Sequence, residues 1–260
     1  MRNWIIGAAA AIAAMAAPSV AVAQATGHVD LGYVNTSVDQ GGFDQDVDTL
    51  VLGGSAAFDL GGLGLQLDGR IGNAEPDTGD DLDFWSVGGH LFKRSNAWLI
   101  GGYVGFGNIE STGADVDEWT VALEGQHYME RTTIDGALSY SEAEDANIES
   151  TAIDLGVRHF LNDNFAIGGN LGFANLESTG TDADSTTFGV EAEWQMESHP
   201  ISIFAGYQHS EVDDADIDAD SLGVGVRYNF GGRSLIDRDR SGAGLRRRGG
   251  VFSRILGGAV

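Results

Sequence analysis

The chain contains no cysteine and only three prolines among its 260 residues. Without cysteine it cannot form a disulfide scaffold, a zinc site with thiolate ligands or a thiol nucleophile. Basic residues are also scarce, because 14 Lys and Arg stand against 39 Asp and Glu and give a formal net charge of −25. Nucleic acid is therefore not expected as a partner, since almost nothing could neutralise its phosphates. The apolar fraction of 42% is too high for a disordered acidic chain.

The charge is distributed over three zones. Residues 1–25 contain one basic residue, Arg2, and no acid. Residues 26–230 contain 37 acidic and 6 basic residues, whereas residues 231–260 contain 7 arginines and 2 aspartates. We therefore treat these three zones as separate parts of the protein.

The first zone, residues 1–25, has the pattern of a secretory signal peptide. Arg2 precedes an unbroken stretch of apolar residues and glycine at 4–17, and the small-x-small sites at 21–23 and 23–25 follow. Such a segment is cleaved during secretion. A retained membrane anchor is the alternative, but the alanine content and the cleavage sites favour removal. We expect the chain to leave the cytoplasm and pass through the periplasm.

The second zone, residues 26–230, is dominated by a period of two, which predicts β-strands. Apolar residues alternate with polar or small ones in Leu63–Ile71, Trp119–Gly125 and Leu222–Phe230. Turn signals divide the zone into twelve candidate strands of about 10–13 residues, the length that a tilted strand needs to cross a bilayer. The predicted strands are 28–38, 48–58, 63–74, 82–92, 97–109, 118–128, 132–141, 149–159, 165–176, 186–196, 201–210 and 221–230.

The connections between these strands alternate in kind. One set is short, and the other set is longer and contains 26 Asp or Glu without one Lys or Arg. An even number of strands with short turns at one end and acidic loops at the other predicts an all-β, transmembrane, up-and-down antiparallel β-barrel. The predicted acidic loops are 39–48, 75–83, 110–118, 142–149, 177–184 and 211–220.

Aromatic residues form two bands on the apolar face of the predicted strands. Membrane interfaces select such bands, because amphipathic rings lie well at the level of the headgroups. A soluble β-sandwich has the same alternation but no reason to sort its aromatic residues in this way. The interface candidates are Phe58, Trp98, Trp194, Tyr228 and Phe230 near the short turns, and Trp85, Phe106 and Trp119 near the acidic loops.

The end of the last predicted strand, Gly225-Val-Arg-Tyr228-Asn-Phe230, resembles the terminal-strand signal of Gram-negative outer-membrane β-barrels. Residues 26–230 as a whole resemble a small porin-like barrel of that group. The resemblance implies a location in the cell outer membrane, with lipid and lipopolysaccharide as partners. It also implies recognition of Gly225, Tyr228 and Phe230 by the barrel-assembly machinery. One departure is that such barrels usually finish at the terminal aromatic residue, whereas this chain continues for 30 residues.

The inward face of the predicted barrel is polar and acidic. Charged residues in this number cannot lie unpaired in a dry core, so either water or a network of ion pairs fills the interior. Twelve strands and many small residues favour water, and the acidic excess favours cations over anions. The arginines either form a basic patch opposite the acids or pair with neighbouring acids for stability. The lumen and selectivity candidates are Asp68, Arg70, Glu124, Asp135, Asp154, Arg158, Glu191, Glu193 and Arg227.

Neither an enzyme nor a specific metal site is favoured by the sequence. No histidine has a serine two residues away, as outer-membrane phospholipases do, and only His28-Val-Asp30 approaches the Asp-x-His pair of outer-membrane proteases. The acids of 213–220 offer hard oxygen ligands, but they do not match an EF-hand. We expect diffuse binding of divalent cations there, and we predict no catalytic residue, no cofactor and no metal site.

The third zone, residues 231–260, is rich in glycine and arginine. We expect a flexible periplasmic tail without fixed structure, because such a composition does not favour packing. The alternative is electrostatic: Arg246, Arg247 and Arg248 could reach the acidic lumen and gate it, or bind phosphates. The sequence thus predicts a passive, mildly cation-preferring porin-like channel for small hydrophilic solutes. A structural or adhesive surface barrel with a closed lumen is the alternative.

Overall fold

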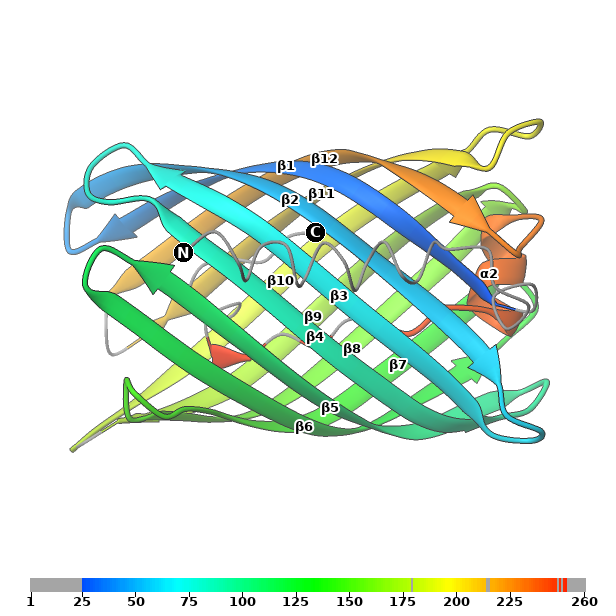
Figure 1. Ribbon diagram of the computed structural model, residues 1–260, viewed down its shortest axis with the longest axis horizontal. Coiled ribbons are helices and arrows are strands. Elements are labelled where there is room, and N and C mark those ends of the chain that lie inside the picture. The colour runs from blue at the N-terminus through cyan, green and yellow to red at the C-terminus, as the bar shows by residue number, and fades with distance from the viewer. Residues whose placement is uncertain (1–24, 179, 214–215, 247, 249, 252–260) are drawn as a thin grey trace.

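The protein forms one closed barrel of twelve antiparallel strands in the computed structural model (Figure 1). The structure describes residues 25–178, 180–213, 216–246, 248, 250 and 251, so the predicted signal peptide at 1–25 lies almost entirely outside the described residues. The strands are β1 Thr26–Gln40, β2 Phe43–Asp59, β3 Gly64–Pro76, β4 Leu82–Arg94, β5 Trp98–Ser111, β6 Ala114–Tyr128, β7 Thr132–Ala143, β8 Ile148–Asn162, β9 Phe165–Ser178, β10 Thr181–Gln195, β11 Ile201–Val212 and β12 Ile217–Phe230.

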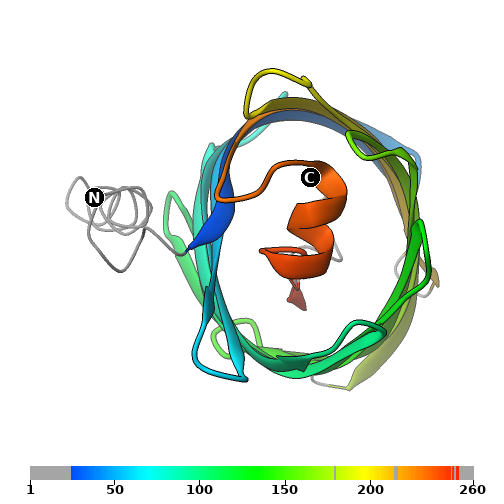
Figure 2. The same ribbon diagram turned by 90° about the vertical axis from the view of Figure 1, so that its right-hand side faces the viewer.

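Each strand pairs with its neighbours in sequence, and β1 pairs with β12 to close the ring (Figure 2). The closing register runs from Gly27 opposite Phe230 to Gln40 opposite Ile217. Closure removes the free sheet edges that would otherwise expose unpaired backbone groups. The twelve predicted strands are thereby confirmed, together with the up-and-down order. In the described residues, no helix is long and apolar enough to cross a membrane.

The two faces of the barrel wall follow from the alternation in the sequence. Along β12 the side chains of Leu222 and Val224 point outward and are 60% and 49% exposed, whereas Gly225 and Arg227 point inward. The same pattern recurs on the other strands, so that the outer surface is apolar and the interior is polar. An apolar outer surface of this extent needs lipid rather than water around it.

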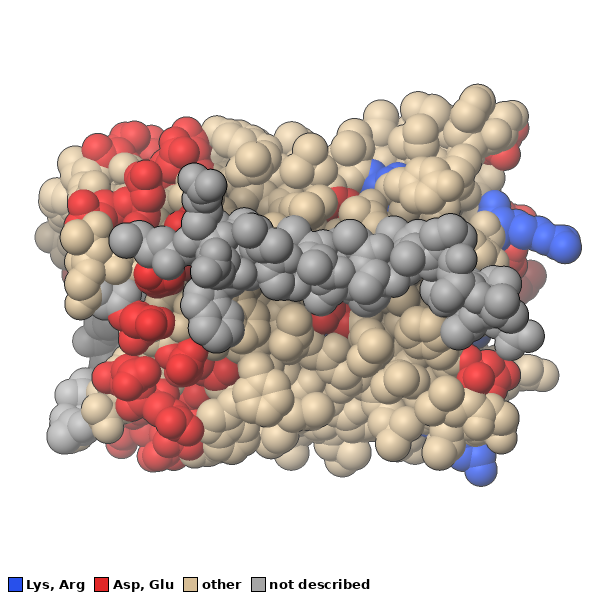
Figure 3. Space-filling view, viewed as in Figure 1, with Lys and Arg blue, Asp and Glu red and all other residues tan. Residues whose placement is uncertain are grey.

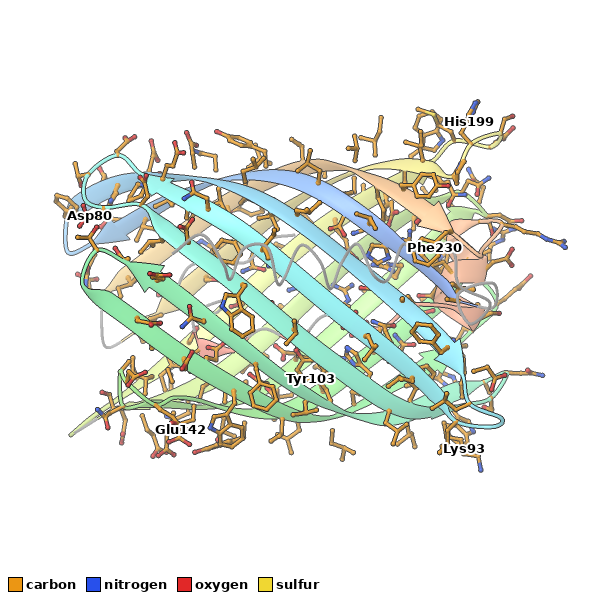
Figure 4. All side chains as sticks on the ribbon, in the orientation of Figure 1. Asp80, Lys93, Tyr103, Glu142, His199 and Phe230 are labelled. Atoms are coloured by element: carbon orange, nitrogen blue, oxygen red, sulfur yellow. The ribbon has the colours of Figure 1, made fainter. Side chains whose placement is uncertain are left out.

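The eight predicted interface aromatics all lie on the outward face. Trp98, Phe106, Trp194 and Tyr228 are 40–56% exposed, and the other four are half-buried. The two bands lie toward opposite ends of the barrel. Figure 4 shows these ends, with Lys93 and His199 at the end where β1 begins, here called the terminal end, and Asp80 and Glu142 at the other, here called the acidic end.

The acidic end differs from the prediction of long loops. The strands continue through most of the predicted loop residues, so that β2 begins at Phe43 and β12 at Ile217, and at most five residues separate paired strands there. Aspartate is uncommon in strands, but here the acids alternate with Val, Ala or Ile and lie on the outer face beyond the aromatic band. They gather at one end of the molecule (Figure 3). The chain turns sharply at glycines with positive φ, such as Gly113 and Gly180.

The C-terminal zone also differs from the prediction of a tail without fixed structure. After Phe230 the chain turns back and forms helix α2, Leu235–Ser241, inside the terminal end of the barrel (Figure 2). Residues 242–246 then continue up the lumen, where Ala243 and Leu245 are only 3% and 5% exposed. The prediction was wrong because it considered only the composition of the segment, whereas contacts with the barrel wall hold the segment in place. Its partners are the polar side chains of the barrel wall.

Candidate functional site: the lumen and its C-terminal segment

All nine predicted lumen residues lie on the inward face of the barrel. Eight of them line a cavity of about 440 Å³, which remains in the lumen beside the C-terminal segment. The ninth, Glu124, is 3% exposed and lies against His90 and Arg248. We refer to residues 234–248, without Arg247, as the lumen segment, because their contacts define the site; Arg247 lies outside the described residues.

The first cluster of the site surrounds Glu193 on β10. Its Oε2 accepts a hydrogen bond from Arg227 of β12 at 2.8 Å and another from Arg238 of α2 at 2.6 Å. Its Oε1 accepts a hydrogen bond from Ser202 at 2.7 Å. Asn229 accepts a hydrogen bond from Arg238 as well. Paired guanidinium groups are the arrangement that makes a buried carboxylate tolerable in a low-dielectric interior.

The second cluster surrounds Glu191, one inward position along β10. Its Oε1 lies 3.0 Å from Nη2 of Arg158 and 3.0 Å from Nη2 of Arg246. The Nε of Arg246 lies 3.4 Å from Asp135 of β7. One arginine of the lumen segment therefore bridges carboxylates from two strands, β7 and β10, that are three strands apart in the wall.

The third cluster is a chain of hydrogen bonds through His90 on β4. Nδ1 of His90 lies 2.7 Å from Glu124, and Nε2 lies 2.6 Å from Asp68. Glu124 in turn lies 3.1 Å from Nε of Arg248, and Asp68 accepts a hydrogen bond from Gln66 at 3.0 Å. Since His90 is fully buried, this network fixes the two carboxylates in one position.

Apolar and main-chain contacts hold the lumen segment at two further points. Leu235 packs against Phe160 and Ala166, while Leu245 packs against Phe92, Leu99 and Tyr128. The main chain of Leu245 exchanges two hydrogen bonds with the side chain of Gln66, at 3.0 and 3.2 Å. Helix α2 is capped by Ser234, whose side chain accepts a hydrogen bond from the backbone of Asp237.

Two arginines of the wall pair with acids of β10. Arg158 pairs with Glu191 at 3.0 Å, and Arg227 pairs with Glu193 at 2.8 Å and lies 3.9 Å from Asp30 on the adjacent strand. The guanidinium groups of Arg227 and Arg70 also lie 4.7 and 5.6 Å from the ring centres of Phe204 and Phe84. Such cation–π contacts hold an arginine flat against the wall.

Three members of the site were not found from the sequence. His90 and Gln66 occupy inward positions of β4 and β3. The alternation of inward and outward residues along these strands could have identified them. Arg238 was hidden in a segment read as a flexible tail. No local pattern marks its role, because its partner Glu193 is 45 residues away in the sequence.

The acidic end carries rows of carboxylates that lie directly opposite one another on adjacent strands. Asp39 lies opposite both Asp44 and Asp218, and Asp218 lies opposite Glu211. The pKa of the Asp44 carboxyl, at a hairpin end beyond the aromatic band, is raised above its ordinary value, because it shares a hydrogen bond with Asp39 and faces that negative charge. Like charges opposite one another repel, so this rim attracts cations. A second row consists of Glu142, Glu149, Glu177 and Asp182.

One group at this rim has the composition of a cation site. His209, Glu211 and Asp218 each offer a ligand atom, and these atoms lie within 4.8 Å of one another. Nδ1 of His209 lies 3.0 Å from Asp220. The sequence prediction favoured diffuse binding here and predicted no metal site.

The sequence model of the family described as Gram-negative porin matches residues 105–237, just over half of the chain. The chain belongs to this family. The resemblance of this porin to outer-membrane barrels, inferred from its terminal strand, is thereby confirmed. The predicted fold of an outer-membrane β-barrel is confirmed as well. No curated protein matches its sequence.

Solved structures share the fold of this porin at low sequence identity. An outer-membrane channel from Pseudomonas putida F1 is 15% identical, with a TM-score of 0.62, and the match covers 79% of this chain and 95% of that one. The translocator domain of the autotransporter NalP from Neisseria meningitidis is 13% identical, with a TM-score of 0.54. The match covers 86% of this chain and 97% of that domain. The KdgM porin is 14% identical, with a TM-score of 0.52, and the match covers 77% of this chain and 99% of that one. At these identities the likeness concerns the fold.

Proposed function

We propose that this porin is a passive diffusion channel for small hydrophilic solutes and that it prefers cations over anions. The observation that carries the proposal is the composition of the inward wall. Away from its two rims, the described wall carries eight carboxylates against four guanidinium groups. The carboxylates are Asp30, Asp68, Glu118, Glu124, Asp135, Asp154, Glu191 and Glu193, and the arginines are Arg70, Arg94, Arg158 and Arg227.

Charge at the entrance supports the same preference. The acidic rows at the rim concentrate cations before they reach the lumen, since the field of many like charges adds up over such a surface. Rings of Asp and Glu along a pore lower the barrier for cations and raise it for anions. The cavity of about 440 Å³ has room for hydrated ions beside the lumen segment.

The competing proposal is a structural or adhesive barrel whose lumen is permanently closed. The lumen segment favours it, because four of its arginines contact the wall or its turns. Catalysis has no comparable support, since His90 is fully buried and already engages two carboxylates.

Conductance across planar bilayers separates the two proposals. The purified chain and a chain lacking residues 231–260 would be compared in a gradient of KCl. We expect discrete channels with a cation-selective reversal potential, and a larger unit conductance for the shortened chain. Silence of both chains over many insertions would favour the closed barrel.

We further propose that the porin reaches the outer membrane through the periplasm and that the barrel-assembly machinery recognises Gly225, Tyr228 and Phe230. Tyr228 and Phe230 lie on the outward face at the end of β12, where another protein could reach them before lipid covers the barrel. Lipid and lipopolysaccharide would then surround the apolar belt. Cross-linking of a Val226→Cys variant to the assembly machinery during export tests this proposal, because Val226 is 51% exposed on the same outward face and its substitution keeps all three signal residues.

A further inference from the structure

The lumen segment is held mainly by ionic and polar contacts. Three of its arginines end on wall carboxylates: Arg238 on Glu193, Arg246 on Glu191 and Asp135, and Arg248 on Glu124. Its buried leucines, Leu235 and Leu245, pack into two small apolar clusters. The segment therefore resembles a bound ligand more than an integral part of the barrel core.

Without this segment, several carboxylates of the wall would lose their cationic partners. Glu124 is fully buried in its side chain, and its charged partners in the structure are His90 and Arg248. On the inward face of the described wall, away from its rims, acids outnumber arginines by eight to four. Unpaired buried carboxylates are costly, so a lumen without the segment would take up cations in its place.

The barrel itself closes without help from the segment. Every strand pairs with two neighbours, and the closing ladder joins residues 27–40 of β1 to the whole of β12. Helix α2 makes few contacts with β1 and contributes no strand to the sheet. Departure of the segment would therefore break side-chain contacts and leave the backbone ladder intact.

The contacts at these carboxylates have a chemistry that suits guanidinium. A guanidinium group is planar and presents several N–H donors in a fixed fork, whereas an ammonium group is a compact point charge. Arg246 uses Nε toward Asp135 and Nη2 toward Glu191, which requires donors set apart in one plane. Arg238 likewise uses Nη1 toward Asn229 and Nη2 toward Glu193.

We propose that these carboxylates are binding sites for small organic cations that carry a guanidinium group, and that the lumen segment is an internal ligand that occupies the same sites. Such solutes and the segment then compete for Glu193, for Glu191 with Asp135, and for Glu124. The inference rests on the proposed function, because a solute reaches these residues only when the lumen is a diffusion path.

Calorimetric titration in detergent tests the competition directly. The probe is ethylguanidinium chloride, and ethylammonium chloride is the matched cation of equal charge. The proteins are the full chain, the variant R238Q/R246Q/R248Q, the chain lacking residues 231–260, and R233Q as a control, because Arg233 is exposed. Heat-dependent gel mobility establishes that each variant is folded.

We expect the triple variant and the shortened chain to bind ethylguanidinium about tenfold or more tightly than the full chain and R233Q, as a charge-assisted hydrogen bond would provide. Binding of ethylammonium should be several-fold weaker in each case. Adding E191Q and E193Q to the shortened chain should remove the guanidinium binding. The triple variant and the shortened chain expose the same sites in different ways, so the test still applies if one of them fails to fold.

Two results would overturn the inference. Equal affinity of the full and the shortened chain would show that the segment does not occupy the sites. Equal affinity for the two cations would show a general attraction of positive charge. Bilayer conductance of the same proteins reports on the pore separately, so a conducting chain without guanidinium binding would leave the proposed function standing and remove this inference.

Discussion

Arg238 of the lumen segment and Arg227 of the wall donate to the same oxygen, Oε2 of Glu193, at 2.6 and 2.8 Å. One carboxylate thus joins the C-terminal segment to the last strand of the barrel. Both guanidinium groups are largely buried, with side chains 6% and 13% exposed. The charge of Glu193 therefore stabilises both the docked segment, through Arg238, and the last strand of the barrel, through Arg227.

The first prediction follows from this shared carboxylate. The substitution E193Q removes the carboxylate that the buried guanidinium groups of Arg238 and Arg227 share. Breaking a buried ion pair from one side costs about 3 kcal/mol. We expect a clear loss of stability in urea unfolding of the barrel in detergent. The substitution E197Q, at an exposed position of the β10–β11 turn, should change stability little. Equal stability of the two variants would contradict a structural role for Glu193.

A second prediction concerns the apolar anchor of the segment. Leu245 is 5% exposed and packs against Phe92, Leu99 and Tyr128. The substitution L245A should loosen this docking by about 2–4 kcal/mol, the usual cost of truncating a buried leucine. Trypsin should then cut at Arg246 and Arg248 faster than in the parent chain. The substitution L60A, at a position 57% exposed, is the control, and similar cleavage of both variants would argue against the anchor.

The sequence predicted the barrel well because its wall obeys a local rule. Alternation with a period of two, visible around Leu222–Phe230, places each residue inside or outside irrespective of its distant partners. The acidic ends were misread as loops, because aspartate is uncommon in strands although strands beyond a bilayer can expose it to water. The position of the lumen segment could not be predicted in the same way. Arg238 and Arg248 find their partners 45 and 124 residues away, and only the closed barrel brings them together.

The absence of cysteine gives a third prediction, on the position of the segment. Single cysteines can be introduced without competition, and Ser241 and Ala243 form a matched pair two residues apart. Ser241 is exposed, whereas Ala243 is 3% exposed inside the lumen. We expect a bulky maleimide to label S241C about tenfold faster or more than A243C, as protection by a folded environment provides. Equally fast labelling of both cysteines would place the segment outside the lumen.

The last prediction concerns Gly225, one of the three residues of the terminal-strand signal. A Cβ atom at this inward position would collide with the ring of Phe204 and the carbonyl oxygen of Leu31. Phe204 is fixed by Arg227, which stacks on it at 4.7 Å, so the ring cannot move away freely. The substitution G225A should therefore destabilise the barrel by about 1–3 kcal/mol, the usual cost of overpacking, and lower its yield in refolding. The matched control is G102A, because a Cβ there would come only within 3.6 Å of the nearest atom. If both variants refold with the yield of the parent chain, the close approach at Gly225 is not a constraint on the fold.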